Sequence, residues 1–358
     1  MAIQGAFTLN PNEIFASLAN MIISQEVFAD NLGKHQTLVD KARVDGSLYG
    51  DKKLYYATDV LESHEWGADA EAGNLLALDR PQDPEVQAIT LDVFRQIRLT
   101  VDNYLTKQAW SSEGAFSSFN SVMLGWMRET KRVYDVTLYN VFIGTTETAL
   151  GAQKQTVGSK SAATPEAEAK VIAEKIANIL VDMGDYSRDY NDYGFLRSYS
   201  EDAIKVIWNS KFVNKIRKVD LPAIFHKEGL VDKFDEEVLP ARYFGTKNTG
   251  KVTTASNTGN YRSVIEKTYN KSGTEYHVFP GDVIPAGVEI AAGEGYIVDP
   301  DIICKIVVKL PPFMSAFEVG TSFFNPRSLT ENHYLTFGHN TLAALKNYPF
   351  VTLRASAE

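Results

Sequence analysis

The most regular pattern of apolar and polar positions lies between residues 86 and 143 of the 358-residue chain. In its first half apolar and polar side chains alternate, and Arg95 is the single interruption of the series Ile89, Leu91, Val93, Ile97, Leu99 and Val101. Successive side chains of a strand point to opposite faces. The alternation therefore predicts a long strand over about residues 87–101 with one buried face.

The second half of this region has a helical period. Spacings of three and four separate the members of the series Phe116, Phe119, Met123, Trp126, Thr130, Val133, Thr137 and Val141. Ser111 or Ser112 can cap the start, and Gly144 can end the helix. We expect a helix over about residues 112–143, about 43 Å long between residues 115 and 143, which is too long for one small core and indicates a spine. Its expected core side chains are Phe116, Phe119, Met123, Trp126, Val133 and Val141.

The first 45 residues contain a shorter amphipathic pattern. After Asn10-Pro11, one helical face carries Ile14, Phe15, Leu18, Met21 and Ile22. The pattern becomes less regular further along the chain. We expect residues 1–45 to be an arm that packs on another part of the structure.

Residues 46–86 are rich in Gly, Asp and Pro and have no clear period. A connection of this length within a compact domain is expected to have a function. Four aromatic side chains suggest that it contacts an adjacent subunit, and the alternative is a floppy loop with incidental aromatics. These side chains are Tyr49, Tyr55, Tyr56 and Trp66.

The remainder, residues 145–358, has α/β character. A helix is expected over residues 165–184, because Pro165 suits its first turn and Gly184 its end. A buried strand is expected over residues 203–209, followed by a helix capped by Ser210. Further strands are expected near residues 302–310 and 348–355, whereas residues 339–347 suit either a short helix or an exposed turn.

Composition narrows the class of protein. Hydrophobic residues make up 44% and charged residues 23% of the chain, as in ordinary soluble proteins. The net charge of -9 is unfavourable for tight binding to nucleic-acid phosphates, which are also negative. The single cysteine, Cys304, lies in an apolar run and is expected to be a buried strand residue. We find no secretory signal and no apolar stretch long enough to cross a membrane.

One motif suggests catalysis. The stretch "GTKNTGKV", residues 245–252, matches a phosphate-binding loop except that Val252 replaces the hydroxyl residue, which arrives late at Thr253. The following residues are β-branched or turn-forming and do not predict the helix that such a loop requires. We therefore favour a β-hairpin, with Asn248-Thr249-Gly250 near its turn.

Other candidate sites are weaker. The carboxylates of Asp182, Asp185, Asp189 and Asp192 do not have calcium-loop spacing. The six histidines show no metal-binding spacing. We predict no catalytic residue, no cofactor and no metal site.

The order of these blocks resembles the major capsid protein of tailed bacteriophages, an α+β protein of the Hong Kong 97-type fold. Three stretches of sequence are similar to those of capsid proteins of small podoviruses. They are "DKARVDGSLYGDKKLYY", "FRQIRLTVDNYLTKQAW" and "ETKRVYDVTLYNVFIG". The resemblance implies an N-terminal arm (1–45), an extended E-loop hairpin (46–86) and a peripheral domain (87–144) that contains the spine helix. It also implies an axial domain (145–320) with a candidate hairpin insertion (243–275), and a return to the peripheral domain (321–358).

The resemblance implies a structural protein and not an enzyme. Copies would assemble into hexamers and pentamers of an icosahedral head that encloses double-stranded DNA without sequence-specific binding. A separate scaffolding protein and a portal would be partners, with no membrane involved. The protein would be assembled in the host cytoplasm and located in the virion. The alternatives are an encapsulin-like shell of a cellular compartment and a nucleotide-binding enzyme with a degenerate phosphate loop at residues 245–253.

Overall fold

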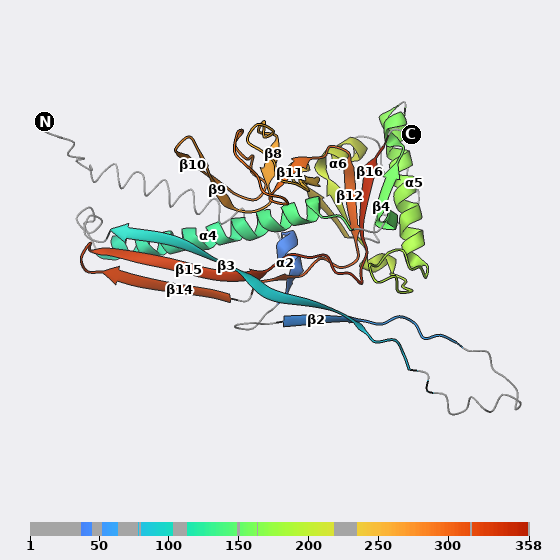
Figure 1. Ribbon diagram of the computed structural model, residues 1–358, viewed down its shortest axis with the longest axis horizontal. Coiled ribbons are helices and arrows are strands. Elements are labelled where there is room, and N and C mark those ends of the chain that lie inside the picture. The colour runs from blue at the N-terminus through green and yellow to red at the C-terminus, as the bar shows by residue number, and fades with distance from the viewer. Residues whose placement is uncertain are drawn as a thin grey trace, which may run out of the picture. The chain divides into compact units, whose positions relative to one another are not determined.

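The computed structural model describes residues 37–44, 52–63, 78, 80–102, 113–148, 151–162, 164–217, 235–315 and 317–356 (Figure 1). The chain divides into two compact units. Unit 1 contains Met1–Asp51, Thr90–Tyr139 and Phe313–Thr341, and unit 2 contains Lys52–Ile89, Asn140–Pro312 and Leu342–Glu358. The boundary falls within two long elements, β3 (Glu85–Asp102) and α4 (Glu113–Thr145).

Long antiparallel strands form the sheet of unit 1. β14 (Phe317–Asn325) pairs with β15 (Thr330–Asn340), and β15 pairs with β3. The complete sheet has the order β14-β15-β3-β2, where β2 (Lys52–Ala57) belongs to unit 2. The predicted alternating strand is confirmed and runs from residue 85 to residue 102.

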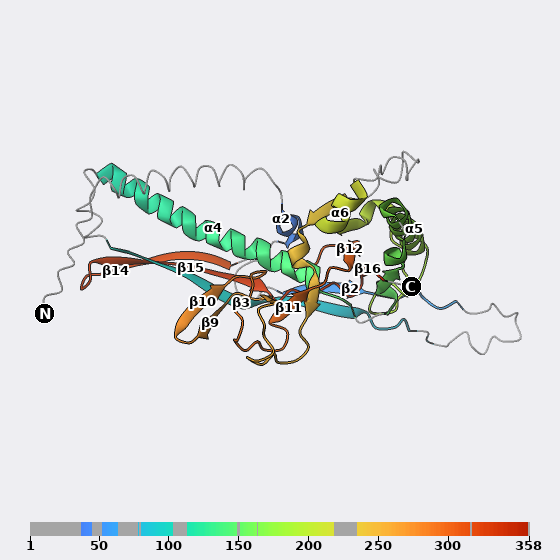
Figure 2. The same ribbon diagram turned by 90° about the horizontal axis from the view of Figure 1, so that it is seen from above.

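The predicted long helix is confirmed as α4, and within unit 1 it lies along β14, β15 and β3 (Figures 1 and 2). Tyr134 of the helix meets Phe337 of β15 edge to face, with ring centroids 5.7 Å apart. Met127 is buried on the same side. The short elements α2 (Leu38–Ala42) and β1 (Arg43–Val44) precede these, and β1 pairs in parallel with β13 (Phe313–Met314).

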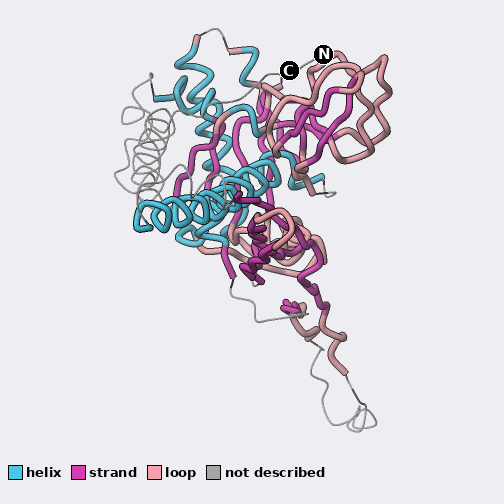
Figure 3. Tube along the Cα trace, turned by 90° about the vertical axis from the view of Figure 1, so that its left-hand side faces the viewer, coloured by secondary structure: helices cyan, strands magenta, loops and turns pink. Residues whose placement is uncertain are grey.

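Unit 2 is built on a five-stranded sheet of the order β4-β16-β12-β5-β6. The strands are β4 (Lys154–Val157), β16 (Phe350–Ala355), β12 (Ile302–Val307), β5 (Lys205–Asn209) and β6 (Asp235–Leu239). Helices α5 (Pro165–Gly184) and α6 (Ser210–Arg217) lie beside it (Figure 3). Their apolar faces join β5, β12 and β16 in the largest core of the unit. Short 3-10 turns occur at Gly151–Gln153, Ser159–Ser161, Glu201–Ala203 and Ala241–Tyr243.

The start of α5 shows why its sequence prediction is correct. The side chain of Thr164 accepts a hydrogen bond from Ala167 N at 3.2 Å, and Pro165 occupies the first turn. Thr164 satisfies one of the unpaired N–H groups of the helix N-terminus, and Pro165 has no N–H that needs a partner. Residues 341–345 form neither helix nor strand, so the short helix considered there is absent from this described stretch.

A second, smaller sheet of unit 2 corrects one prediction. β7 (Gly245–Lys247) and β8 (Tyr261–Ser263) both pair with β11 (Gly295–Val298) and not with each other. Asn248 explains this, because its amide donates to Gly250 O and Ala291 O and accepts from Gly295 N. The hairpin predicted around residues 248–250 is therefore wrong. The hairpin of this region consists of β9 (Lys267–Lys271) and β10 (Thr274–Val278).

The end of the chain is divided between the units. Residues 321–341 belong to unit 1, whereas residues 342–358 belong to unit 2, where β16 pairs with β12 and β4. The expected return to the peripheral domain over residues 321–358 stays a prediction. Helices and strands are mixed throughout, as expected for an α+β protein.

Candidate functional site

The segment that resembles a phosphate loop lacks the necessary geometry. β7 is followed by turns and bends up to residue 260, with no helix whose N-terminus could face a phosphate. Lys251 Nζ lies 2.9 Å from Glu289 Oε1, so its charge is paired at the surface. Residues 245–260 therefore do not support nucleotide binding.

Of the four aromatic side chains expected at a subunit contact, two are described. Tyr55 is half-buried, and Lys309 Nζ lies 5.3 Å from the centre of its ring and 5.5 Å from that of Tyr348. Burial raises the pKa of Tyr55. Tyr56, by contrast, is 63% exposed. Tyr49 and Trp66 lie outside the described residues.

Tyr55 belongs to a small cleft of about 160 Å³ in unit 2. Four stretches form it: β2, the residue Gln87 of β3, and two loops around residues 193 and 345–348. The lining side chains are those of Leu54, Tyr55, Tyr56, Gln87, Tyr193, Leu345, Asn347 and Tyr348. Tyr55 is thus already packed on its own chain, and only Tyr56 is largely available for another molecule.

Three large hydrophobic side chains are exposed among the described residues between β2 and β3. We call residues 58–84 the extension. Leu61 is 77% exposed and Leu78 is 82% exposed, which are the two largest values among the described large hydrophobic side chains. Val60 is exposed in the same segment, and Leu54, Tyr56 and Val86 are exposed in the adjoining strands. Large exposed apolar patches mark interaction surfaces.

Helix α4 presents a second exposed apolar surface, in unit 1. Trp126 is 50% exposed and Val133 is 41% exposed. Both were expected in the core of this chain, and the structure shows that neither lies there. The reason is geometric: the sheet covers the side of Met127 and Tyr134, about 100° around the helix from Trp126. Val141, in unit 2, is fully buried against Tyr243 and Tyr296. The side chains of Phe116, Phe119 and Met123 lie outside the described residues.

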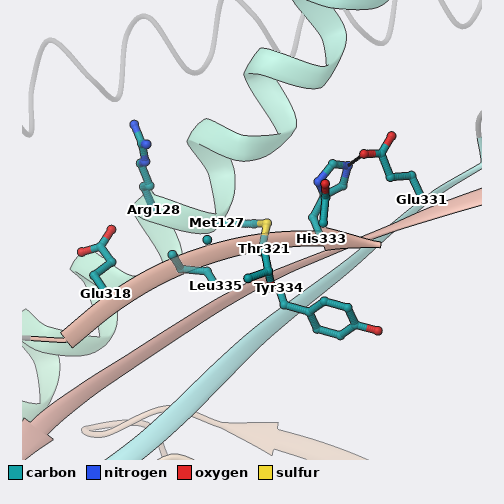
Figure 4. A pocket seen from close by; sticks show the side chains of 10 residues that line it. Met127, Arg128, Glu318, Thr321, Glu331, His333, Tyr334 and Leu335 are labelled. Atoms are coloured by element: carbon teal, nitrogen blue, oxygen red, sulfur yellow. Dashed lines mark ion pairs between the residues drawn. The ribbon is translucent and has the colours of Figure 1, made fainter. Parts of the chain in front are cut away.

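A groove of about 620 Å³ lies between α4 and the strands β14 and β15 in unit 1 (Figure 4). Arg128 and Glu318 lie at one end, and His333 and Glu331 lie at the other. Met127 and Leu335 provide apolar surface between them. Each end pairs an acidic with a basic side chain, so the groove does not select a small ligand of one charge.

A buried cluster of charges lies at the middle of α4. Asp135 is 1% exposed and its Oδ2 lies 3.3 Å from Arg43 Nη2 and 3.6 Å from Lys131 Nζ. Lys131 Nζ also lies 3.1 Å from Glu318 Oε2. Burial outweighs these cations and raises the pKa of Asp135 to about 6. This cluster was not predictable from the sequence, because Arg43 and Glu318 lie far from Lys131 and Asp135 in the chain.

A buried lysine occupies the central strand of unit 2. Lys305 is fully buried, and its Nζ donates to Thr146 O at 2.9 Å and to Thr352 Oγ1 at 2.8 Å. Burial lowers the pKa of Lys305 to about 7. Its neighbour Cys304 is also fully buried, as predicted, and burial raises the pKa of the thiol. A buried thiol of this kind is a packing residue and not a nucleophile.

The described residues contain no group of three or more His, Cys, Asp or Glu side chains that could hold a metal ion. Among the described helices, none combines the length and the apolar composition that a membrane crossing requires.

Comparison with known proteins shows the fold. The chain is similar to a capsid structure of Staphylococcus phage Andhra, with 11% identity, a TM-score of 0.56 and coverage of 89% of this chain and 84% of that one. It is also similar to a structure of the head fibre and inner core protein gp22 of native bacteriophage P68, with 10% identity, a TM-score of 0.60 and the same coverage of both chains. No curated protein matches the chain. The fold is therefore the Hong Kong 97-type capsid fold.

A family comparison extends this result to sequence. The family described as "Phi29-like phage major capsid protein" matches residues 3–353, which is nearly the whole chain. This match supports a structural role in a phage capsid, which is an oligomeric assembly of the virion. It gives no support to the two alternatives, a compartment shell and a nucleotide-binding enzyme. The chain belongs to the Phi29-like phage major capsid protein family.

Proposed function

We propose that copies of this chain assemble into hexamers and pentamers, which close into an icosahedral head around double-stranded DNA. The observation that carries the proposal is the exposed apolar surface of the extension, above all Leu61 and Leu78. An extension buries such surface only against another molecule, and repeated identical contacts between copies generate closed symmetric assemblies.

The contact on the extension is assigned to particular side chains. Tyr56 is exposed on β2, directly before the extension, and is the aromatic residue that we expect to contact an adjacent copy. Tyr55 contributes indirectly, because it is packed against Tyr348 of its own chain. Tyr49 and Trp66 remain predicted contact residues.

The role of the DNA is passive in this proposal. A net charge of -9 allows the shell to enclose DNA without binding its phosphates tightly. Specific DNA binding is not required, and neither is catalysis. Assembly in the host cytoplasm with a separate scaffolding protein and a portal completes the proposal.

The experiment is assembly of purified subunits, followed by sedimentation and negative-stain microscopy. The test variant replaces Leu61 and Leu78 by serine. Because both side chains are exposed, we expect the subunit to fold with an unchanged melting temperature but to lose closed particles. The control is Val181→Ser on α5, a side chain that is 67% exposed outside the extension. Normal particles from the double variant would contradict the proposal.

A further inference from the structure

The outgoing end of the extension is fixed by Asp59. Its Oδ2 accepts from Arg188 Nη1 at 2.6 Å, and its Oδ1 accepts from Leu196 N at 3.0 Å. Arg197 Nη2 donates to the carbonyl oxygen of Thr58, directly before it. The hydrogen bond from Arg188, followed by that from the Leu196 N–H, lowers the pKa of Asp59 to about 2, so the carboxylate stays charged at any ordinary pH.

The returning end is fixed by Gln87 in β3. Its Nε2 donates to Ala344 O at 3.0 Å, and its Oε1 accepts from Lys346 N at 2.8 Å. Both hydrogen bonds join the side chain to the backbone of one loop, so the amide cannot rotate without losing them. Asp59 and Gln87 together are called the base clamp.

The loop that holds Asp59 is itself rigid. Ser187 and Arg197 exchange two backbone hydrogen bonds of 3.0 Å. The fully buried Asn191 donates to Phe195 O and accepts from Phe195 N, which closes the turn between them. Arg188 Nη1 also donates to Gly194 O at 2.8 Å, so the cation that binds Asp59 is held from both sides. Preorganised partners of this kind hold a side chain in one geometry.

Beyond the clamp the chain has a different character. Every described residue from Val60 to Val86 is exposed. Among the described residues from 58 to 87, Asp59 and Gln87 are the side chains that form hydrogen bonds to loops distant in sequence.

We infer that Asp59 and Gln87 are positioning residues, which set the direction in which the extension leaves unit 2 and thereby the angle between neighbouring copies in the shell. The inference rests on the proposed function, because it assigns the clamp a role in that contact. Two attachment points define a direction, whereas one would leave a hinge. An extension without a fixed direction still presents Leu61 and Leu78, but at variable angles, so the curvature of an assembly would vary.

The direct test measures the extension in the free subunit. Spin labels are placed at Leu61→Cys and Val181→Cys, both exposed positions of unit 2, while the buried Cys304 does not react. With the clamp intact we expect a narrow distribution of distances between the labels. In the variant Asp59→Ala with Gln87→Ala, we expect its width to rise at least about twofold. An unchanged width overturns the inference, whether or not particles form.

A second measurement follows the clamp bonds and the assembly. Hydrogen exchange should accelerate at the Leu196 amide in Asp59→Ala and at the Lys346 amide in Gln87→Ala, because each amide loses its acceptor. Particles of the clamp variant should have a spread of diameters at least about twice that of the parent. The control is Asp189→Ala, an exposed carboxylate in the same loop. Uniform particles from the clamp variant overturn the inference. Failure of the parent to assemble overturns the proposed function instead. In that case the distances between the spin labels test the role of the clamp.

Discussion

Arg43 Nη2 lies 3.3 Å from Asp135 Oδ2 and joins the residue that follows α2 to the middle of α4. Asp135 is almost fully buried, and its other oxygen, Oδ1, has no hydrogen-bond partner among the described residues. An ionised carboxylate in this position loses hydration that two cations restore only in part. The cluster therefore makes unit 1 sensitive to pH.

The first prediction concerns Asp135→Asn. Burial raises the pKa of Asp135 from 3.8 to about 6, so between these pH values the folded protein holds a proton that the unfolded chain releases. This contribution to stability is complete below pH 4 and is lost as the pH rises to 6. The free energy of unfolding of the parent should fall by about 2 kcal/mol relative to the Asn variant over this interval. Urea denaturation at several pH values measures the difference, and a constant difference would contradict the prediction.

The sequence could predict the long elements, since β3 and α4 have strong periods that hold over many residues. It could not assign the exposed side of α4. Trp126 and Val141 fit the same spacing, yet Trp126 is 50% exposed and Val141 is buried, because tertiary packing decides which apolar residues are covered. Thr352, which accepts from Lys305, and Arg43, which pairs with Asp135, come from distant segments, and only the folded chain brings them to these residues.

The base clamp was not predictable either. Asp59 and Gln87 are ordinary polar residues in the sequence, and their hydrogen-bond partners are mainly backbone groups of loops more than 100 residues away. The Asn248-Thr249-Gly250 turn shows the converse. Its local signal for a hairpin is strong, but the Asn248 side chain joins the segment to β11, and this long-range pairing prevails.

A second prediction compares two glycines of α4. A Cβ at Gly144 would lie only 2.6 Å from the carbonyl carbon of Tyr243 in unit 2, whereas a Cβ at Gly125 would meet nothing within 4 Å. Gly144→Ala should therefore destabilise the protein by about 3 kcal/mol, because the backbone it meets cannot move freely. Gly125→Ala should stabilise it by about 0.5–1 kcal/mol through helix propensity. Denaturant unfolding of both variants checks the opposite signs, and equal effects would refute the packing argument.

A third prediction concerns the buried Lys305. Burial lowers its pKa from 10.5 to about 7, so between these values the unfolded chain carries a proton that the folded protein lacks. Stability should therefore rise with pH across this window. The free energy of unfolding of the parent should rise by roughly 1 kcal/mol per pH unit relative to that of Lys305→Met. Denaturant unfolding from pH 7 to pH 10 measures this difference.

The last prediction separates the two ends of α4. Trp126 is half-exposed, so Trp126→Gln should change the stability of the isolated subunit by less than about 0.5 kcal/mol. Val141 is fully buried against Tyr243 and Tyr296, so Val141→Ala should cost about 2 kcal/mol through lost contacts and a residual cavity. If the exposed side of α4 meets another copy, Trp126→Gln should instead lower the yield of particles. Thermal unfolding and sedimentation of the same samples distinguish the effects. A large loss of subunit stability in Trp126→Gln would mean that its side chain packs within its own chain.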